Sequence, residues 1–131
     1  MKKTQNIIAV FIAIMMILLA GCGKKAESID ITSGDIVTSI EVITTNGSKV
    51  DITEADQIKD VVNALKAAEP TRMESVNDQP TNVDSYGTVS INTDDGSTEI
   101  YYYDKDGKHY LEQPYTGIYE MKDSLESTLT P

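Results

Sequence analysis

Few side chains of this 131-residue sequence could carry out covalent chemistry or bind a transition metal. The chain contains one cysteine, Cys22, and one histidine, His109. A serine nucleophile needs a histidine that shuttles protons, and zinc-type sites need several His or Cys ligands. His109 follows a turn signal and is expected on an exposed strand face. The sequence therefore predicts no catalytic residue, no cofactor and no metal site built on His or Cys.

Carboxylates are abundant, with 21 Asp and Glu residues, but their spacing singles out no site. The best oxygen-ligand candidate is the turn Asp104-Lys105-Asp106-Gly107. An EF-hand loop aligned on Gly107 would start at Tyr102 and end at Gln113, where that loop requires Asp and Glu. A hairpin turn is the better interpretation, as it is for Asp94-Asp95-Gly96. We therefore expect no metal, and a hydrolase built on paired carboxylates is only a third alternative for the function.

The cysteine stands at the end of an export signal. Two lysines precede Ile7–Ala20, a run of 14 apolar residues, which is shorter than the about 20 residues of a membrane-spanning helix. Leu19-Ala20-Gly21-Cys22 resembles the lipobox of bacterial lipoproteins, whose cysteine receives a diacylglycerol and becomes the first residue of the mature chain. We therefore expect a signal peptide over residues 1–21, a lipid anchor on Cys22, and a location on the outer face of the cytoplasmic membrane. The alternatives are an ordinary secretory signal and a buried helix.

The charge balance limits the possible partners. The formal net charge is −10, and loss of residues 1–21, which contain two lysines and no acids, makes it −12. Affinity for nucleic acid depends largely on Lys and Arg that neutralise phosphates, so the composition argues against a nucleic-acid partner. We expect residues 22–34 to be the lipidated cysteine with a flexible tether, and residues 35–131 to form a single extracytoplasmic domain.

The order of strand and helix patterns predicts an α+β fold. A small antiparallel sheet of about five strands is expected, packed with one central helix and a short C-terminal helix. The expected strands are residues 36–45, 50–53, 86–92, 98–103 and 109–112. The polar residues 71–85 then form a long connection.

Capping and turn residues set the expected ends of these elements. The central helix is expected at Glu54–Ala68, with Thr53 as its N-cap. Asn46-Gly47 predicts a type I′ hairpin turn. Ile118, Met121, Leu125 and Leu129 recur at helical spacing and predict the C-terminal helix.

Tyrosines supply the candidate binding surface. Tyr101-Tyr102-Tyr103 places rings on both faces of one strand, so at least one ring is expected on the less buried face. The segment from Glu112 to Tyr119, which includes Gln113 and Tyr115, forms a polar and aromatic corner after the last strand. Both stretches suit recognition of a partner. The alternatives are edge packing under the helices for the tyrosines and a structural bend for the corner.

Several segments resemble a known family of small lipoproteins. These segments are Thr53–Asp60 with Val61–Leu65, Pro70–Arg72, Glu74–Asp78, the tyrosine strand, Tyr110–Tyr115 and Gly117–Tyr119. They resemble lipoproteins of Bacillus-like Gram-positive bacteria that carry a domain of unknown function. They are also similar to the extracellular C-terminal part of some membrane metallopeptidases of the beta-lactam-sensor type. The resemblance implies a location outside the cytoplasmic membrane and an association with sensing, and it carries over no catalytic residue.

The resemblance also draws attention to Arg72, the only arginine of the chain, in the long connection. A lone arginine in an acidic domain is either an ion-pair partner of a nearby acid or a clamp for a carboxylate ligand.

We therefore expect a membrane-anchored, non-catalytic binding or interaction domain that contacts a protein, a wall fragment or a small molecule. Its expected site residues are Tyr101, Tyr102, Tyr103, Glu112, Gln113, Tyr115 and Arg72. The first alternative is an immunity or inhibitor lipoprotein that sequesters a cationic peptide, because a charge of −12 lies beside the lipid anchor. Sequestration by charge should weaken sharply at high ionic strength, whereas contact through tyrosines should not.

Overall fold

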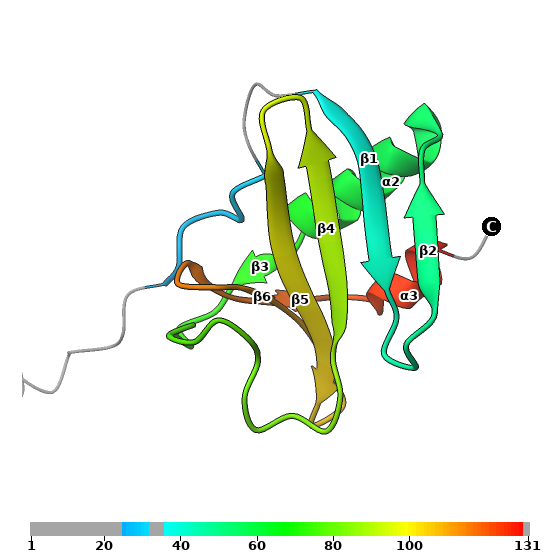
Figure 1. Ribbon diagram of the computed structural model, residues 1–131. Coiled ribbons are helices and arrows are strands. Elements are labelled where there is room, and N and C mark those ends of the chain that lie inside the picture. Colours follow the sequence, from blue (N-terminus) through cyan, green and yellow to red (C-terminus); the bar gives the residue numbers. More distant parts are fainter. Residues whose placement is uncertain (1–24, 32–35, 130–131) are drawn as a thin grey trace, which may run out of the picture.

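The computed structural model describes residues 25–31 and 36–129, so the predicted signal peptide and Cys22 lie outside the described residues. Within these residues, seven strands form one sheet in the order β2-β1-β4-β5-β6-β7-β3, and every neighbouring pair is antiparallel (Figure 1). The elements are β1 (Val37–Ile43), β2 (Lys49–Ile52), α2 (Ala55–Lys66), β3 (Glu69–Pro70), β4 (Gly87–Thr93), β5 (Ser97–Lys105), β6 (Lys108–Gln113), β7 (Gly117–Met121) and α3 (Leu125–Leu129). The predicted α+β class with an antiparallel sheet is confirmed.

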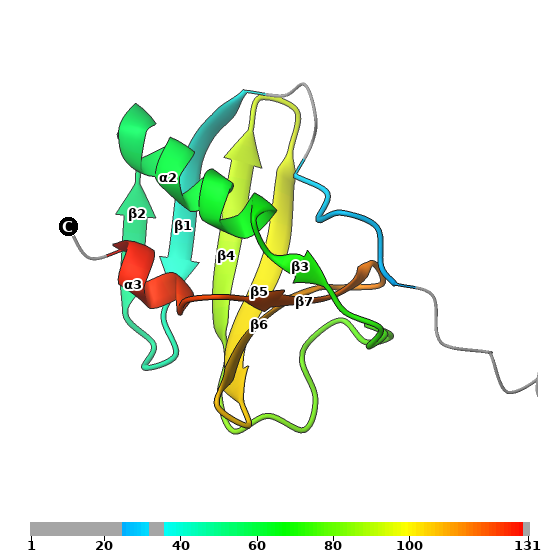
Figure 2. The ribbon, with the colours of Figure 1, turned by 180° about the vertical axis from the view of Figure 1, so that it is seen from behind.

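Helices α2 and α3 cover one face of the sheet (Figure 2). In α2 the apolar residues Ile58, Val61, Val62 and Leu65 recur at helical spacing, and Val61 and Leu65 are fully buried against the sheet. The sheet contributes alternate residues to the same core: Ile40, Val42, Ile52, Val89, Ile91, Ile100, Tyr102, Leu111, Tyr119 and Met121. The helix-covered face therefore holds the main hydrophobic core.

The β5–β6 hairpin fixes the register on which the site depends. Asp106 and Gly107 have φ values of 53° and 75°, the left-handed pair that a two-residue type I′ turn requires. Lys105 lies opposite Lys108 across this turn, and the register then places Tyr103 opposite Tyr110. The predicted turns at Asp104–Gly107 and at Asp94–Gly96 are both present.

The sheet has two more strands than the about five predicted. Residues 117–121 form β7, although Ile118 and Met121 had the spacing of a helix. Both side chains are buried because they point to opposite faces of a strand whose two faces are covered. The C-terminal helix is accordingly limited to Leu125–Leu129. The two-residue strand β3 pairs with β7, and its proline is tolerated because β3 is the edge of the sheet.

Three local predictions differ from the structure. Helix α2 ends at Lys66, before the predicted Ala68, and its N-cap is Glu54 without a side-chain cap hydrogen bond, instead of Thr53. The β1–β2 turn is not type I′, because only Gly47 has a positive φ, of 86°. Ser48 donates its N–H to the Asn46 side chain, and a three-residue loop with a left-handed glycine forms instead.

Residues 25–31 pack on the domain, whereas the sequence analysis placed them in a flexible tether. Ile29 and Ile31 are buried in the main core. The Gln113 side chain accepts a hydrogen bond from Asp30 N–H at 3.0 Å and donates one to Asp30 C=O at 2.9 Å. The Tyr119 hydroxyl donates to the Glu27 carbonyl at 2.8 Å. Ile29 and Ile31 alternate with the polar Asp30, so both apolar side chains can pack on the domain. The sequence did not predict this packing, because the residues around them are mostly polar.

Candidate binding site

The three tyrosines of β5 are all buried, each only 5% exposed. Tyr102 belongs to the core on the helix-covered face. Strand alternation places Tyr101 and Tyr103 on the opposite face. The predicted exposed tyrosine surface is therefore not found, because none of the three described side chains is exposed. A second layer covers the face that carries Tyr101 and Tyr103.

That second layer is the connection between β3 and β4, residues 71–86. Thr71 N–H and its hydroxyl both donate to the Ile118 carbonyl, at 2.9 and 2.7 Å, which fixes the start of the connection on β7. The Tyr86 ring contacts the Tyr101 ring edge-on, with 5.4 Å between centroids, which fixes its end. Between them, the buried Ser75 hydroxyl donates to Glu112 Oε1 at 2.7 Å. The connection is therefore a structured cover over β5 and β6.

A pocket of about 300 Å³ lies between this cover and the sheet, and we name it the connection pocket. Its lining residues are Met73, Glu74, Asn77, Thr81, Tyr103, Lys105, Asp106, Tyr110, Glu112 and Ile118. The buried part of this lining is formed by Tyr103, Glu112 and Ile118, whereas Glu74, Asn77 and Asp106 are exposed at its rim. Two of the predicted site residues, Tyr103 and Glu112, thus lie together in one concave site.

Glu112 gives the pocket its electrostatic character. It is 5% exposed and is the only Asp or Glu among the described residues that is buried. No Lys, Arg or His of residues 25–31 and 36–129 forms an ion pair with it. Burial, followed by the neighbouring Glu112 carboxylate, raises the pKa of Tyr103, so this phenol stays protonated as a donor. The pocket therefore combines a buried carboxylate with neutral hydroxyl donors.

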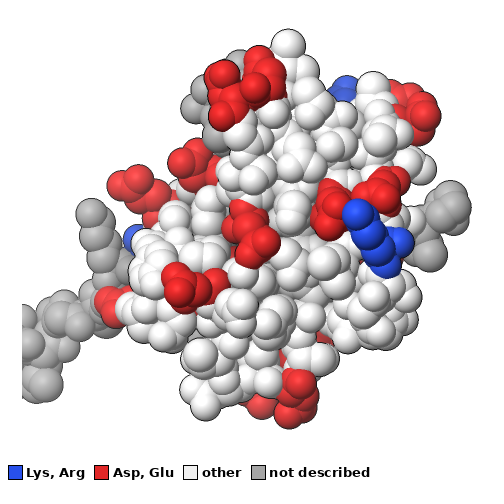
Figure 3. All heavy atoms as spheres, in the orientation of Figure 1, with Lys and Arg blue, Asp and Glu red and all other residues white. Residues whose placement is uncertain are grey.

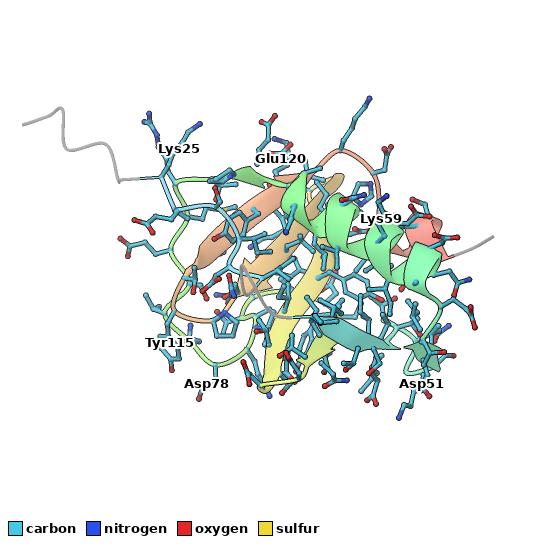
Figure 4. The ribbon with its side chains drawn as sticks, turned by 90° about the horizontal axis from the view of Figure 1, so that it is seen from above. Lys25, Asp51, Lys59, Asp78, Tyr115 and Glu120 are labelled. Carbon is cyan, nitrogen blue, oxygen red and sulfur yellow. The ribbon has the colours of Figure 1, made fainter. Side chains whose placement is uncertain are left out.

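The two predicted site residues of the corner after β6, Gln113 and Tyr115, have different roles. Gln113 holds the N-terminal segment through Asp30 and does not line the pocket. Tyr115 is 67% exposed, has a φ of 58°, and donates its hydroxyl to Asp78 Oδ1 at 2.7 Å. This hydrogen bond raises the pKa of Tyr115. Figure 4 shows Tyr115 and Asp78 at the same end of the molecule as Lys25. Tyr115 thus fastens the tip of the connection to the corner.

Arg72 lies exposed in the connection, outside the pocket lining. It forms no ion pair with another described residue, so the expected acid partner is not found in that part of the chain.

The predicted site residues do not include eight of the residues that line the pocket: Met73, Glu74, Asn77, Thr81, Lys105, Asp106, Tyr110 and Ile118. Tyr110 could have been found by counting back from the Asp106-Gly107 turn, because a two-residue hairpin loop fixes Tyr110 opposite Tyr103. Their rings lie 5.7 Å apart at an interplanar angle of 35°. The connection residues carry no comparable signal, because an irregular segment has no side-chain period.

The described residues form other hollows, including two of about 320 and 330 Å³, but none of them is lined by a predicted site residue. His109 Nδ1 lies 2.6 Å from Asp104 Oδ1 in an exposed pair. The described part of the chain contains no group of three or more His, Cys, Asp or Glu side chains arranged for a metal. Neither α2 nor α3 is long and apolar enough to span a membrane. A wider hollow of about 680 Å³ beside residues 27–31 contains none of the predicted site residues.

Two comparisons with known proteins find matches that cover most of the chain. The family model DUF5301, described as "Domain of unknown function (DUF5300)", matches residues 25–120. A protein from Ruminococcus gnavus whose structure was solved by NMR is 29% identical, with a TM-score of 0.67 over 78% of this chain and 99% of that chain. No curated protein matches the chain. The family match begins at residue 25, at the start of the docked N-terminal segment, which supports treating that segment as part of the domain.

Proposed function

The chain belongs to the DUF5301 family, and from that premise we propose that it is a membrane-anchored, extracytoplasmic and non-catalytic binding domain whose ligand occupies the connection pocket. The observation that carries the proposal is the pocket itself. A long irregular connection lies over a sheet face that already holds buried aromatic and charged side chains. Long ordered connections of this kind are commonly functional, and small-ligand sites are concave with a few convergent polar groups.

The anchor is supported by the sequence alone. The two lysines, the apolar run and the lipobox at Leu19–Cys22 occur in the order that an exported lipoprotein requires. Mass spectrometry of the protein purified from membranes tests this directly. We expect a mature chain that starts at diacylglyceryl-modified Cys22, and a Cys22→Ala variant that lacks both the modification and the cleavage. An unmodified Cys22, or cleavage elsewhere, would contradict the anchor.

The pocket is tested separately by NMR on the full mature chain labelled with ¹⁵N, kept in detergent micelles. Cationic, anionic and neutral short peptides and sugars serve as probes. We expect one class of probe to shift the amide signals of residues 73–81, 103–106 and 110–112 together, and to leave β1 and β2 unchanged. The control is Val76→Ser on the exposed outer side of the connection, which should leave those shifts in place. The proposal fails if no class of probe perturbs the pocket.

The hydrolase alternative is not favoured by any observation. A hydrolase built on carboxylates would be favoured by a pair of buried acids in one cleft. In the connection pocket Glu112 is buried, but Glu74 and Asp106 are exposed to solvent. The site offers groups that bind and hold a ligand, and we propose binding as its function.

A further inference from the structure

We propose that the connection pocket binds the cationic side chain of a peptide, a lysine or an arginine, with Glu112 as its counter-charge. This inference rests on the proposed function and deepens it by naming the class of ligand. It follows from the buried charge, the aromatic wall, the charge of the rim and the size of the pocket.

The buried charge is the first argument. A carboxylate removed from water is costly unless it is paired with a cation and hydrogen-bonded. Glu112 accepts hydrogen bonds from the Ser75 hydroxyl, at 2.7 Å, and from the neighbouring Tyr103 phenol, but it forms no ion pair with any described residue. Its side chain lines an open pocket, so a ligand can reach it. A cation supplied from outside would complete the partnership that the described part of the fold leaves incomplete.

The aromatic wall is the second argument. Tyr103 and Tyr110 lie opposite each other on β5 and β6, and both residues line the pocket. Ring faces attract ammonium and guanidinium groups, most strongly where water is excluded. Tyr103 is buried and Tyr110 half-buried, so this wall is partly shielded from solvent. The wall therefore favours a cation whose aliphatic stem can pack on the rings.

The rim is the third argument. Glu74 comes from the connection and Asp106 from the β5–β6 turn, so carboxylates border the pocket from both of its sides. With Glu112 the lining contains three acids against one lysine, Lys105. The rest of the molecule adds to this field: the sheet face opposite the helices shows many more carboxylates than Lys or Arg side chains (Figure 3). Such a field attracts cationic ligands and raises their rate of association.

The size of the pocket limits the ligand. About 300 Å³ is at the lower end of the about 300–1,000 Å³ of small-ligand sites. It suits one extended side chain and excludes a folded domain. The rest of a peptide would lie outside, along the exposed connection.

Lys105 supplies an internal test because it is the only cation in the pocket lining. It forms no ion pair with a described residue, and its position next to the site makes it a competitor for the same field. Removing its charge with Lys105→Gln should therefore strengthen binding of a cationic peptide, whereas a purely structural pocket would be indifferent to this change.

The experiment uses the full mature chain in detergent micelles and titrates it with the tripeptide acetyl-Gly-Lys-Gly-amide, followed by NMR and calorimetry. The same peptide with an acetylated lysine is the uncharged control probe, and an arginine peptide is the second cationic probe. Glu112→Gln keeps the shape and the acceptor for Ser75 but removes the charge. Asp95→Asn, on the exposed β4–β5 turn, removes the same charge far from the pocket and is the matched control variant.

We expect the lysine peptide to shift pocket signals, the acetylated peptide to bind at least tenfold more weakly, and Glu112→Gln to weaken binding at least tenfold. Asp95→Asn should change affinity less than twofold, and Lys105→Gln should increase it. If Glu112→Gln does not fold, Asp106→Asn on the exposed rim gives a second reading, with an expected loss of two- to fivefold.

Two results overturn the inference. Equal loss in Glu112→Gln and Asp95→Asn would show that only net charge matters, and equal binding of the acetylated peptide would show that the cation does not matter. In either case neutral probes that still shift the pocket signals would leave the proposed function standing. Only a pocket that responds to no probe class would remove both.

Discussion

Gln113 holds the N-terminal segment with both ends of its side-chain amide. The oxygen accepts from Asp30 N–H and the nitrogen donates to Asp30 C=O, so the side chain imitates a neighbouring strand. Gln113→Ala removes both hydrogen bonds, and each such bond contributes about 0.5–1.5 kcal/mol net. We expect urea unfolding to show a loss of about 1–3 kcal/mol, with Thr116→Ala as an exposed control on the same corner. A loss below that of the control would mean that Asp30 is satisfied by water.

Gly117 lets the same segment approach β7. A Cβ added at Gly117 would collide with the Ala26 side chain. Gly117→Ala should therefore displace residues 26–31 without breaking the sheet, and hydrogen exchange at Ile29 and Ile31 should become faster while β4 stays protected. Gly96→Ala is the control, because an added Cβ there meets nothing within 4 Å. Unchanged exchange at Ile29 and Ile31 would show that the segment shifts aside and stays docked.

At the scale of elements, helix α3 is tied to the sheet through one carboxylate. Glu126 accepts from the Tyr102 hydroxyl at 3.0 Å and from the Thr45 hydroxyl at 3.1 Å, which joins α3 to β5 and to the β1–β2 turn. Five residues are too few for a helix to be stable by itself. Tyr102→Phe should lower stability by about 1 kcal/mol, read from urea unfolding, and loosen α3 before the sheet in hydrogen exchange. Exchange in α3 that matches the parent chain would contradict this role.

Elements that follow a strict local signal were predictable. The helical spacing of the apolar residues in α2 predicts one helix, and the turn residues Asp106-Gly107 predict one hairpin. Both signals depend little on the rest of the chain. β7 was not predictable from the spacing of Ile118 and Met121, because these two side chains are buried under separate layers on opposite faces of the strand, which only the folded chain brings together. The pocket depends on the path of residues 71–86, which no period encodes. Tyr103 and Glu112 were nevertheless among the predicted site residues, Tyr103 as part of the tyrosine strand and Glu112 as part of the corner after β6.

At the scale of the whole molecule, ionisation of the buried tyrosines lowers the free energy of unfolding in alkali. Burial is the main cause that raises the pKa of Tyr101, Tyr102 and Tyr103 above their ordinary value of 10.0, followed by Glu99, Glu126 and Glu112 respectively. A group whose folded pKa lies above its unfolded pKa adds stability that is complete below the unfolded pKa and is lost as the pH rises through the folded one. The urea midpoint should therefore be level between pH 8 and 9 and fall above about pH 10.

A single variant measures how much Tyr102 contributes to the fall of the urea midpoint at high pH. Tyr102→Phe removes one of the three phenols, so its urea midpoint should fall less steeply between pH 10 and 11.5 than that of the parent chain. Parallel curves would mean that Tyr102 ionises in the folded protein without cost.

With the proposed lipid anchor on Cys22, the docked N-terminal segment would shorten the tether between the domain and the bilayer. A tether through residue 34 would allow a reach of about 45 Å, whereas docking from residue 25 leaves three residue steps beyond Cys22, about 10 Å when fully extended. Ala26 N–H donates to the Thr71 carbonyl at 3.3 Å, and Met73, two residues further on, lines the pocket. With Cys22 lipidated, the pocket is therefore held close to the headgroups. Cationic peptides concentrate on anionic bilayers, so a domain with the proposed anchor and ligand would bind peptides adsorbed at the surface in preference to the dilute pool in solution.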